Sequence, residues 1–209
     1  MIRIGYVDIA PLDDGQYRKL YAQATPERQH RADRYLRSED RQRCIVAGAL
    51  LRYALKNKNC AEPSRTPEGK PYIPGREDFH FNLSHSGRWV AIAWGDCPVG
   101  VDVETLDMNE GKEQLARRFF SDDEQAYLFA AGTEDRGLRF LEIWTKKESY
   151  LKYQGTGINR PLNSFSVLNP EALSVSFRSF RPEDAVMTLC AQNTECQIIP
   201  LSLEALISG

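Results

Sequence analysis

The chain has 209 residues, of which 42% are hydrophobic and 27% are charged, a balance typical of one large globular domain or two small ones. Its formal net charge of −2 excludes the global basic field that non-specific nucleic-acid binding needs, so any phosphate must bind at a local cluster. No apolar run reaches the roughly 20 residues of a membrane helix, and the N-terminus lacks the features of a signal peptide.

The first half of the chain predicts strands and two helices. A strand is predicted over 2–9. Thr25 and Pro26 are typical of a helix N-cap followed by proline at the first helical position, and Ser38 is a second candidate N-cap, for a longer helix. The density of proline and glycine over 62–75 predicts a loop. Three short strands are then predicted, over 79–83, 89–94 and 99–103.

The second half is first helical and then rich in strands. Ser121 and Glu124 form a capping-box pattern, and a longer helix is predicted from about 136 to 153, ending before Gly155. Four antiparallel strands are predicted after it, over 165–168, 173–180, 186–191 and 197–203. Helices and strands come in blocks rather than in strict alternation, which predicts an α+β fold, with two lobes divided near residue 104.

Two acidic residues share one predicted strand. Asp102 and Glu104 are two positions apart, so both side chains point to one face, while Val101 and Val103 point to the other face, into a core. Two carboxylates on one face repel each other unless a cation lies between them. The simpler interpretation of this pair is a solvated strand edge.

A third acid lies on the apolar stripe of the predicted helix. Glu148 follows Leu141 and Trp144 at helical spacing, and a bare charge there costs several kcal/mol unless it is paired or bound to a metal. Lys152 lies one turn further on, so an internal Glu148–Lys152 ion pair is an alternative to a metal shared with the two strand acids. Because the chain has only three histidines and many carboxylates, a metal would be a hard one such as Mg²⁺.

The candidate anion-binding residues are basic side chains and one polar turn. Arg28 and Arg31 lie on one face of a short helix, where they would either grip a phosphate or remain solvated. The segment Ser84-His85-Ser86-Gly87 ends a strand with hydroxyls, an imidazole and flexible backbone, which can present donors to a nucleotide. Lys70 is unremarkable by itself. The run 115–120 joins two arginines to aromatics that would either dock a partner or pack in the core.

The order of these blocks resembles the Sfp-type 4'-phosphopantetheinyl transferases. The matching segments run from Lys70 to about Val167 and are FNLSHSGRWVAIA, VGVDVE, RFFSDDE, WTKKESYLKYQGTG and PLNSFSV. The resemblance implies an enzyme that transfers the 4'-phosphopantetheine arm of coenzyme A to a carrier-protein serine. It also implies two similar α/β lobes related by pseudo-twofold symmetry, with the active site in the cleft between them. Lobe 1–104 would bind coenzyme A, and lobe 105–209 would carry the metal and carrier-protein side.

The resemblance also implies roles for individual residues. Asp102, Glu104 and Glu148 would bind the metal, and Val103, which cannot ligate, limits the protein ligands to these three. The residues expected to act in catalysis are Glu148 as proton acceptor, Lys152 at the leaving phosphate, and Asp102. The residues expected to contact coenzyme A are Arg28, Arg31, Arg43, Lys70, Ser84, His85, Lys147 and Lys152.

The expected cofactor is Mg²⁺, with Mn²⁺ as a substitute because oxygen ligands suit both. The expected partners are acyl or peptidyl carrier proteins of fatty-acid, polyketide or non-ribosomal-peptide synthases, in primary or secondary metabolite biosynthesis, and neither nucleic acid nor a membrane. A monomer is expected because both lobes belong to one chain, and the five scattered cysteines predict a cytoplasmic protein. Two alternatives stay open. One is a metal-dependent nuclease or phosphohydrolase, which the net charge disfavours; the other is a catalytically dead carrier-protein-binding module.

Overall fold

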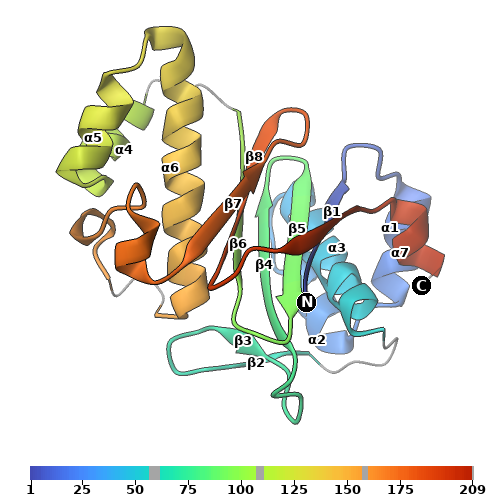
Figure 1. The fold of residues 1–209 in the computed structure, drawn as a ribbon. Helices are drawn as coiled ribbons and strands as arrows, with labels where there is room; N and C mark the ends of the chain where they lie inside the picture. The colour runs from blue at the N-terminus through green and yellow to red at the C-terminus, as the bar shows by residue number, and fades with distance from the viewer. Residues whose placement is uncertain (57–61, 107–110, 157–159, 209) are drawn as a thin grey trace.

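The computed structural model describes residues 1–56, 62–106, 111–156 and 160–208, and it has an α+β architecture, as predicted (Figure 1). A four-stranded sheet has the order β4-β5-β1-β9, and a three-stranded sheet has the order β6-β8-β7. The strands of the first sheet are β4 (His80–Ser86), β5 (Trp89–Gly95), β1 (Ile2–Asp8) and β9 (Cys196–Pro200). Those of the second sheet are β6 (Gly100–Thr105), β8 (Ala185–Ala191) and β7 (Ser176–Phe180).

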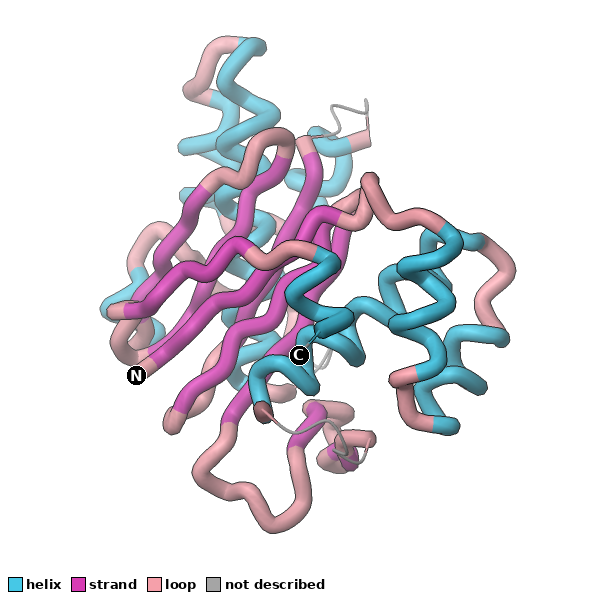
Figure 2. The backbone as a smooth tube through the Cα atoms, turned by 90° about the vertical axis from the view of Figure 1, so that its right-hand side faces the viewer, coloured by secondary structure: helices cyan, strands magenta, loops and turns pink. Residues whose placement is uncertain are grey.

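Helices cover the outer face of each sheet. The first sheet carries α1 (Asp14–Ala22), α2 (Pro26–Asp33), α3 (Ser38–Leu55) and α7 (Leu203–Ser208). The second sheet carries α6 (Thr133–Gln154), with α4 (Lys112–Phe119) and α5 (Asp122–Phe129) beyond it. Figure 2 shows the strands running alongside one another, with the N-terminal helices to one side. A small hairpin of β2 (Ser64–Arg65) and β3 (Pro71–Tyr72) lies below both sheets in Figure 1.

Three hydrophobic cores hold these layers together. Leu50 of α3 packs in the core outside the first sheet, and Ile143 of α6 packs in the core outside the second. The third core lies between the sheets and contains Ile4, Val101 and Met187, all of which are fully buried. Since burying one such side chain stabilises the fold by about 1.5–3 kcal/mol, the contact between the sheets is as much a core as the other two.

Local capping signals were read correctly at two of three helix starts. Thr25 caps α2 by accepting a hydrogen bond from the Arg28 N–H, and Pro26 is the first helical residue. Ser121 and Glu124 form the predicted capping box of α5. The third prediction was wrong by one residue, because Arg37 is the N-cap of α3 and makes no side-chain cap hydrogen bond.

Several predicted strands differ from the structure. The predicted loop 62–75 contains the β2–β3 hairpin, and the segment 165–168 forms no strand. The last strand, β9, pairs in parallel with β1 rather than in an antiparallel meander, and α7 begins at Leu203. The C-terminal half of the chain therefore contributes a strand and a helix to the N-terminal sheet.

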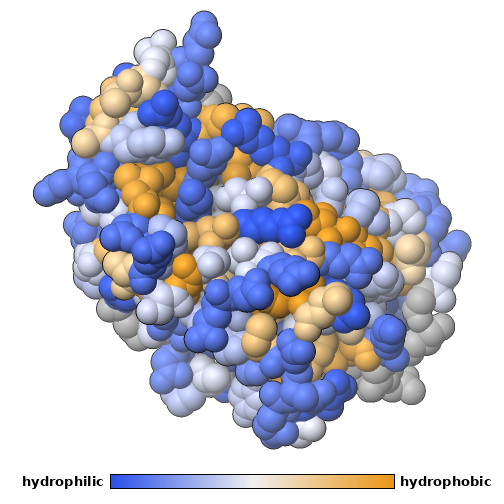
Figure 3. All heavy atoms as spheres, viewed as in Figure 1, coloured by the Kyte–Doolittle hydropathy of each residue, from blue (hydrophilic) through white to orange (hydrophobic). Residues whose placement is uncertain are grey.

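The surface is mainly polar on the face shown in Figure 3, with apolar atoms gathered in patches over the centre and toward the α4–α5 end. Two large apolar side chains of that end are exposed, Leu115 by 40% and Tyr127 by 42%. Within the described ranges, none of the helices combines the length and the apolarity needed to cross a membrane.

Candidate active site

The two strand acids lie on the face of β6 that α6 covers. Asp102 lies opposite Thr188 of β8, and the Thr188 hydroxyl is 2.7 Å from the hydroxyl of Thr145 on α6. Val101 and Val103 point the other way and are fully buried between the sheets, as the alternation predicted. Strand periodicity therefore placed both acids on the correct face.

Asp102 is the centre of a polar cluster. Its Oδ1 accepts hydrogen bonds from Ser84 Oγ at 2.9 Å and from Lys152 Nζ at 2.6 Å. Lys152 Nζ also donates to Ser84 Oγ at 2.9 Å, so the three side chains form a closed triangle. Asp102 is 4% exposed, and its Oδ2 is buried without a hydrogen-bond partner. Lys152 thus pairs with Asp102, not with Glu148 as the local alternative predicted.

Glu104 and Glu148 lie within electrostatic reach of Asp102. Burial and then the Asp102 charge raise the pKa of Glu148 above its usual value. The pKa of Glu104 is also raised, first by burial and then by Asp102, although a 2.7 Å hydrogen bond from Ser86 Oγ opposes the shift. A cation between these carboxylates would reverse both shifts because it favours the ionised forms.

The donor chemistry of this cluster fits a hard divalent cation. Among the residues that the structure describes, no three acidic, histidine or cysteine side chains are arranged as a finished metal cage. The cluster nevertheless offers carboxylate oxygens, which Mg²⁺ prefers, and the buried Asp102 Oδ2 has a free acceptor position.

A cavity of about 330 Å³, here called the arginine cavity, lies beside the cluster. Its lining comes from α2, α3, β4 and the β2–β3 hairpin, and includes Arg28, Arg31, Cys44, Arg65, Asn82 and His85. Glu62 bridges the first two residues: Arg28 Nε donates to Glu62 Oε1 at 2.9 Å, and Arg31 Nη2 lies 3.5 Å from Oε2. A carboxylate therefore already occupies the position where these two arginines could bind an anion.

A second cavity of about 320 Å³, here called the lysine cavity, adjoins the first because Pro71 and Asn82 line both. Its lining also includes Lys70, Glu148, Lys152 and Gly155. Lys70 Nζ donates to the carbonyl of Tyr153, near the end of α6, at 2.6 Å, and burial lowers the pKa of Lys70. Gly155 ends α6 with φ of 71°, and a Cβ there would lie 2.7 Å from Lys70 Cδ. Only glycine tolerates both conditions.

His85 lines the arginine cavity, and Arg43 lies close to His85 without lining the cavity. The pKa of His85 is lowered by burial and then by the charges of Arg43 and Lys152, which favours the neutral imidazole. Arg43 lines neither of the two cavities. Its Nη1 donates to the Gly87 carbonyl at 2.7 Å and its Nη2 to Asp40 at 2.6 Å, so it supports the β4–β5 turn beside His85.

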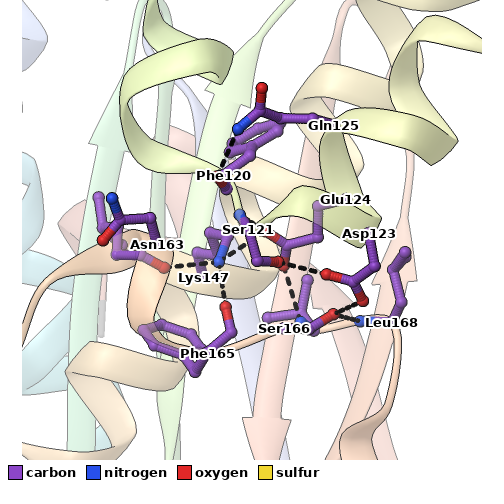
Figure 4. A network of polar contacts seen from close by, with 12 residues as sticks. Phe120, Ser121, Asp123, Glu124, Gln125, Lys147, Asn163, Phe165, Ser166 and Leu168 are labelled. Carbon is purple, nitrogen blue, oxygen red and sulfur yellow. Dashed lines mark hydrogen bonds and ion pairs between the residues drawn. The ribbon is translucent and has the colours of Figure 1, made fainter.

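Lys147, predicted from the family resemblance to face the pyrophosphate, lies elsewhere (Figure 4). It is fully buried, with Nζ 2.7 Å from Glu124 and donating to the carbonyls of Leu162 and Phe165 at 2.7 and 2.6 Å. An ammonium group has three donors, and all three are used here. The helical period already indicates that the two lysines face different sides, because five residues of α-helix turn Lys147 about 140° away from Lys152.

Sequence reasoning missed two residues of this region and placed a third, Ser86, in a nucleotide-binding turn rather than beside an acid. Glu62 bridges the two arginines but lies in a loop more than 30 positions away along the chain, without any local pattern. Asn82 lines both cavities, and Ser86 binds Glu104. For these two a signal existed: together with Ser84 they are polar residues at alternate positions of one strand.

Comparison with known proteins finds matches over most of the chain. A family model described as 4'-phosphopantetheinyl transferase superfamily matches residues 98–198, and one described as 4'-phosphopantetheinyl transferase, N-terminal, matches residues 12–96. A 4'-phosphopantetheinyl transferase of Bacillus subtilis is 36% identical over 167 residues, which cover 78% of this chain and 73% of the relative. The 4'-phosphopantetheinyl transferase Sfp of Bacillus subtilis (strain 168) is 34% identical with the same coverage. The 4'-phosphopantetheinyl transferase gsp of Aneurinibacillus migulanus is 30% identical over 189 residues, 88% of this chain and 78% of the relative.

Proposed function

This chain belongs to the 4'-phosphopantetheinyl transferase superfamily, of the Sfp type, and from that premise we propose that its two adjoining cavities are the active site. The enzyme transfers the 4'-phosphopantetheine arm of coenzyme A to a carrier protein. The observation that carries the assignment is the triangle of Asp102, Lys152 and Ser84 beside both cavities, where acid, base and hydroxyl converge.

Asp102, Glu104 and Glu148 would hold Mg²⁺, or Mn²⁺ in its place. Three features of these residues support this: their oxygen donors, the raised pKa of both glutamates, and the buried, unpartnered Asp102 Oδ2. When bound, the cation supplies positive charge to the pyrophosphate oxygens of coenzyme A. Lys152 Nζ lies 2.6 Å from Asp102 Oδ1 and lines the lysine cavity, so its positive charge is close both to the acids and to the proposed phosphate position.

Coenzyme A would bind with its phosphorylated nucleotide in the arginine cavity. Arg28 and Arg31 offer the 3'-phosphate two guanidinium groups, and a phosphate with two charges would displace the single carboxylate of Glu62 from them. His85, on β4, lines the arginine cavity, and Lys70, on the hairpin, lines the lysine cavity. Ser84 lines neither cavity and would act through its contacts with Asp102 and Lys152. Arg43 would act through the turn that it supports, and Lys147 is left out of this site.

The reaction requires one bond to form and one to break. The carrier-protein serine oxygen attacks the β-phosphorus, the bond from that phosphorus to the bridging oxygen breaks, and 3',5'-ADP leaves. Glu148 would accept the serine proton, since its carboxylate lines the lysine cavity together with Lys152. Lys152 would stabilise the charge that develops on the leaving phosphate.

The two-lobe description is proposed on the same premise. Each half of the chain packs one long helix, α3 or α6, against its own sheet, which supports two similar lobes with an active-site cleft between them. The proposed boundary near residue 104 differs from the division of the sheets, because β6 already belongs to the second sheet and the sheets change between β5 and β6. Strand β9 crosses this division. The carrier-protein classes, the monomeric state and the cytoplasmic location stay predictions.

The test is intact-mass spectrometry of an apo carrier protein incubated with this protein, coenzyme A and Mg²⁺. We expect the carrier to gain the mass of one phosphopantetheine arm, and EDTA to abolish the gain. A dead binding module would bind the carrier and leave its mass unchanged, and a nuclease would cleave nucleic acid. No gain across a panel of carriers, with coenzyme A binding intact, would overturn the assignment.

A further inference from the structure

Three polar side chains of β4 take the place of a neighbouring strand for β6. The N–H of Val101 donates to Asn82 Oδ1 at 2.9 Å, that of Val103 to Ser84 Oγ at 3.3 Å, and that of Thr105 to Ser86 Oγ at 3.4 Å. Asn82, Ser84 and Ser86 are here called the side-chain ladder. β4 and β6 are the edges of different sheets, so these N–H groups have no backbone partner on that side.

Two members of the side-chain ladder also bind the acids. Ser84 Oγ donates to Asp102 at 2.9 Å, and Ser86 Oγ donates to Glu104 Oε2 at 2.7 Å. A hydroxyl has one donor and two acceptor positions, so each serine can accept from the β6 backbone and donate to a β6 carboxylate at the same time. Because both strands have a period of two residues, the serine spacing matches the acid spacing.

The strand end that carries Ser86 is itself held from two sides. Gly87 has φ of 51°, and a Cβ at this position would lie 2.6 Å from Cγ2 of Thr105, so the turn lies directly on the end of β6. From the other side, Arg43 Nη1 donates to the Gly87 carbonyl. Ser86 therefore projects from a fixed point, as an orienting group must.

We propose that Ser86 is a positioning residue that fixes the Glu104 carboxylate for the cation, in parallel with Ser84 and Asp102. The inference rests on the proposed role of these acids as metal ligands. A carboxylate that binds a metal needs a hydrogen bond to fix its orientation, and loss of such a partner typically weakens metal affinity by about 10–100-fold. A glutamate side chain has more rotatable bonds than an aspartate side chain. The hydrogen bond from Ser86 therefore restricts the carboxylate of Glu104 more than the bond from Ser84 restricts that of Asp102.

The first test is Mn²⁺ affinity, measured by electron paramagnetic resonance on the coenzyme A complex of the whole chain. We expect Ser86→Ala to weaken binding by about 10–100-fold and Ser86→Thr, which keeps the hydroxyl, to stay near wild type. Ser176→Ala, on β7 at the far edge of the second sheet, is the matched control and should change nothing. The metal concentration for half-maximal transfer should rise by the same factor in Ser86→Ala, with kcat recovered at saturating metal.

Three outcomes separate this inference from the proposed function. If Glu104→Ala loses Mn²⁺ while Ser86→Ala binds like wild type, Ser86 only joins the strands and the inference is wrong. If wild type binds no Mn²⁺ but still modifies carrier protein, the metal assignment and the inference both fail while the transferase assignment stands. If Ser86→Ala unfolds, Ser86→Thr is compared with Ser86→Val, because the two side chains have the same shape and differ only in the hydroxyl. Equal Mn²⁺ affinities of these two variants would overturn the inference.

Discussion

At the scale of single residues, the carboxylate of Asp102 is hydrogen-bonded through one of its two oxygens. One carboxylate oxygen accepts from both Ser84 and Lys152, and the other is buried without a partner. Leaving a buried acceptor unsatisfied costs about 1–3 kcal/mol, which evolution tolerates most readily where a ligand completes the site. The unpartnered oxygen of Asp102 therefore supports the proposal that a ligand completes this site.

Removing either Asp102 or Glu148 should abolish most of the activity. We expect Asp102→Ala and Glu148→Ala to lower kcat/KM for carrier-protein modification by about 100-fold or more, because the charge that offsets the pyrophosphate can no longer be held in place. Transfer is measured by the rate of mass gain of the carrier. Glu142→Ala, on the same helix and paired with Arg181, is the control. Near-normal turnover in either site variant would disprove the metal assignment.

How well single residues could be predicted depended on whether their partners are local. Strand period placed Asp102, Val101 and Val103 correctly, because orientation within a strand is set by the strand itself. The bridge from Glu62 to Arg28 joins a loop to helix α2 across a long stretch of sequence, and no local pattern encodes it. Lys147 points away from the cavities because the helical period turns it from the side of Lys152, and the family resemblance by itself does not contain this geometry.

At the scale of elements, α6 serves two different purposes. One face carries Glu148 and Lys152 to the cavities, and another carries Lys147 to a buried network. There Glu124 also accepts from the N–H groups of Ser121 and Val167, so the network ties α5 and the segment after α6 to the helix. That segment includes Leu162, which lines the lysine cavity.

We predict that Lys147→Met destabilises the fold without a specific loss of coenzyme A binding. Removing one partner leaves the Glu124 charge buried and unpaired, which typically costs about 3–5 kcal/mol. The free energy of unfolding in urea measures this, and Lys146→Met, at the neighbouring position, is the control. A Lys147→Met variant with normal stability but weakened coenzyme A affinity would restore Lys147 to the active site.

The arginines of α4 give a prediction about the carrier protein. Arg117 and Arg118 lie over the rings of Phe129 and Phe119, beside the exposed Leu115. If this end docks an acidic carrier, Arg117→Glu with Arg118→Glu should raise the carrier KM several-fold at low salt and less at high salt, with little change in kcat. The control is Arg18→Glu on α1. An unchanged KM for the carrier protein would show that Arg117 and Arg118 do not contribute to carrier binding.

Elements with strong local signals were predicted, and those that depend on distant partners were not. The capping box of Asp13 and Gln16 at the start of α1 is a local signal in the sequence, but it is not among the predicted helix starts. The direction of β9 could not be predicted from its own residues, because the strand is parallel only relative to its neighbour β1, which lies far away along the chain. The pairing β2–β3 is two residues long, too short for a pattern in a loop rich in proline and glycine.

At the scale of the whole molecule, the two sheets share a core, and β9 ties the ends of the chain together. We therefore predict that both halves unfold in one transition. Trp89 and Trp94 report on the first sheet and Trp144 on α6, so fluorescence of Trp144→Phe and of the Trp89→Phe/Trp94→Phe double variant should give the same urea midpoint. Because each substitution can itself change the stability, the urea midpoint of each variant is also measured by circular dichroism, and its fluorescence midpoint is compared with that value. Two separate midpoints would show that the halves are independent domains.

The pairing of β1 with β9 also determines the order in which the protein can be completed on the ribosome. β1 is synthesised long before β9, so its second neighbour is not made until residue 200 has been added. Until then the nascent chain presents an open edge of β1, to which other chains could add. The first sheet gains its last strand only after all three strands of the second sheet have been synthesised, so premature termination anywhere between β1 and β9 leaves that edge exposed.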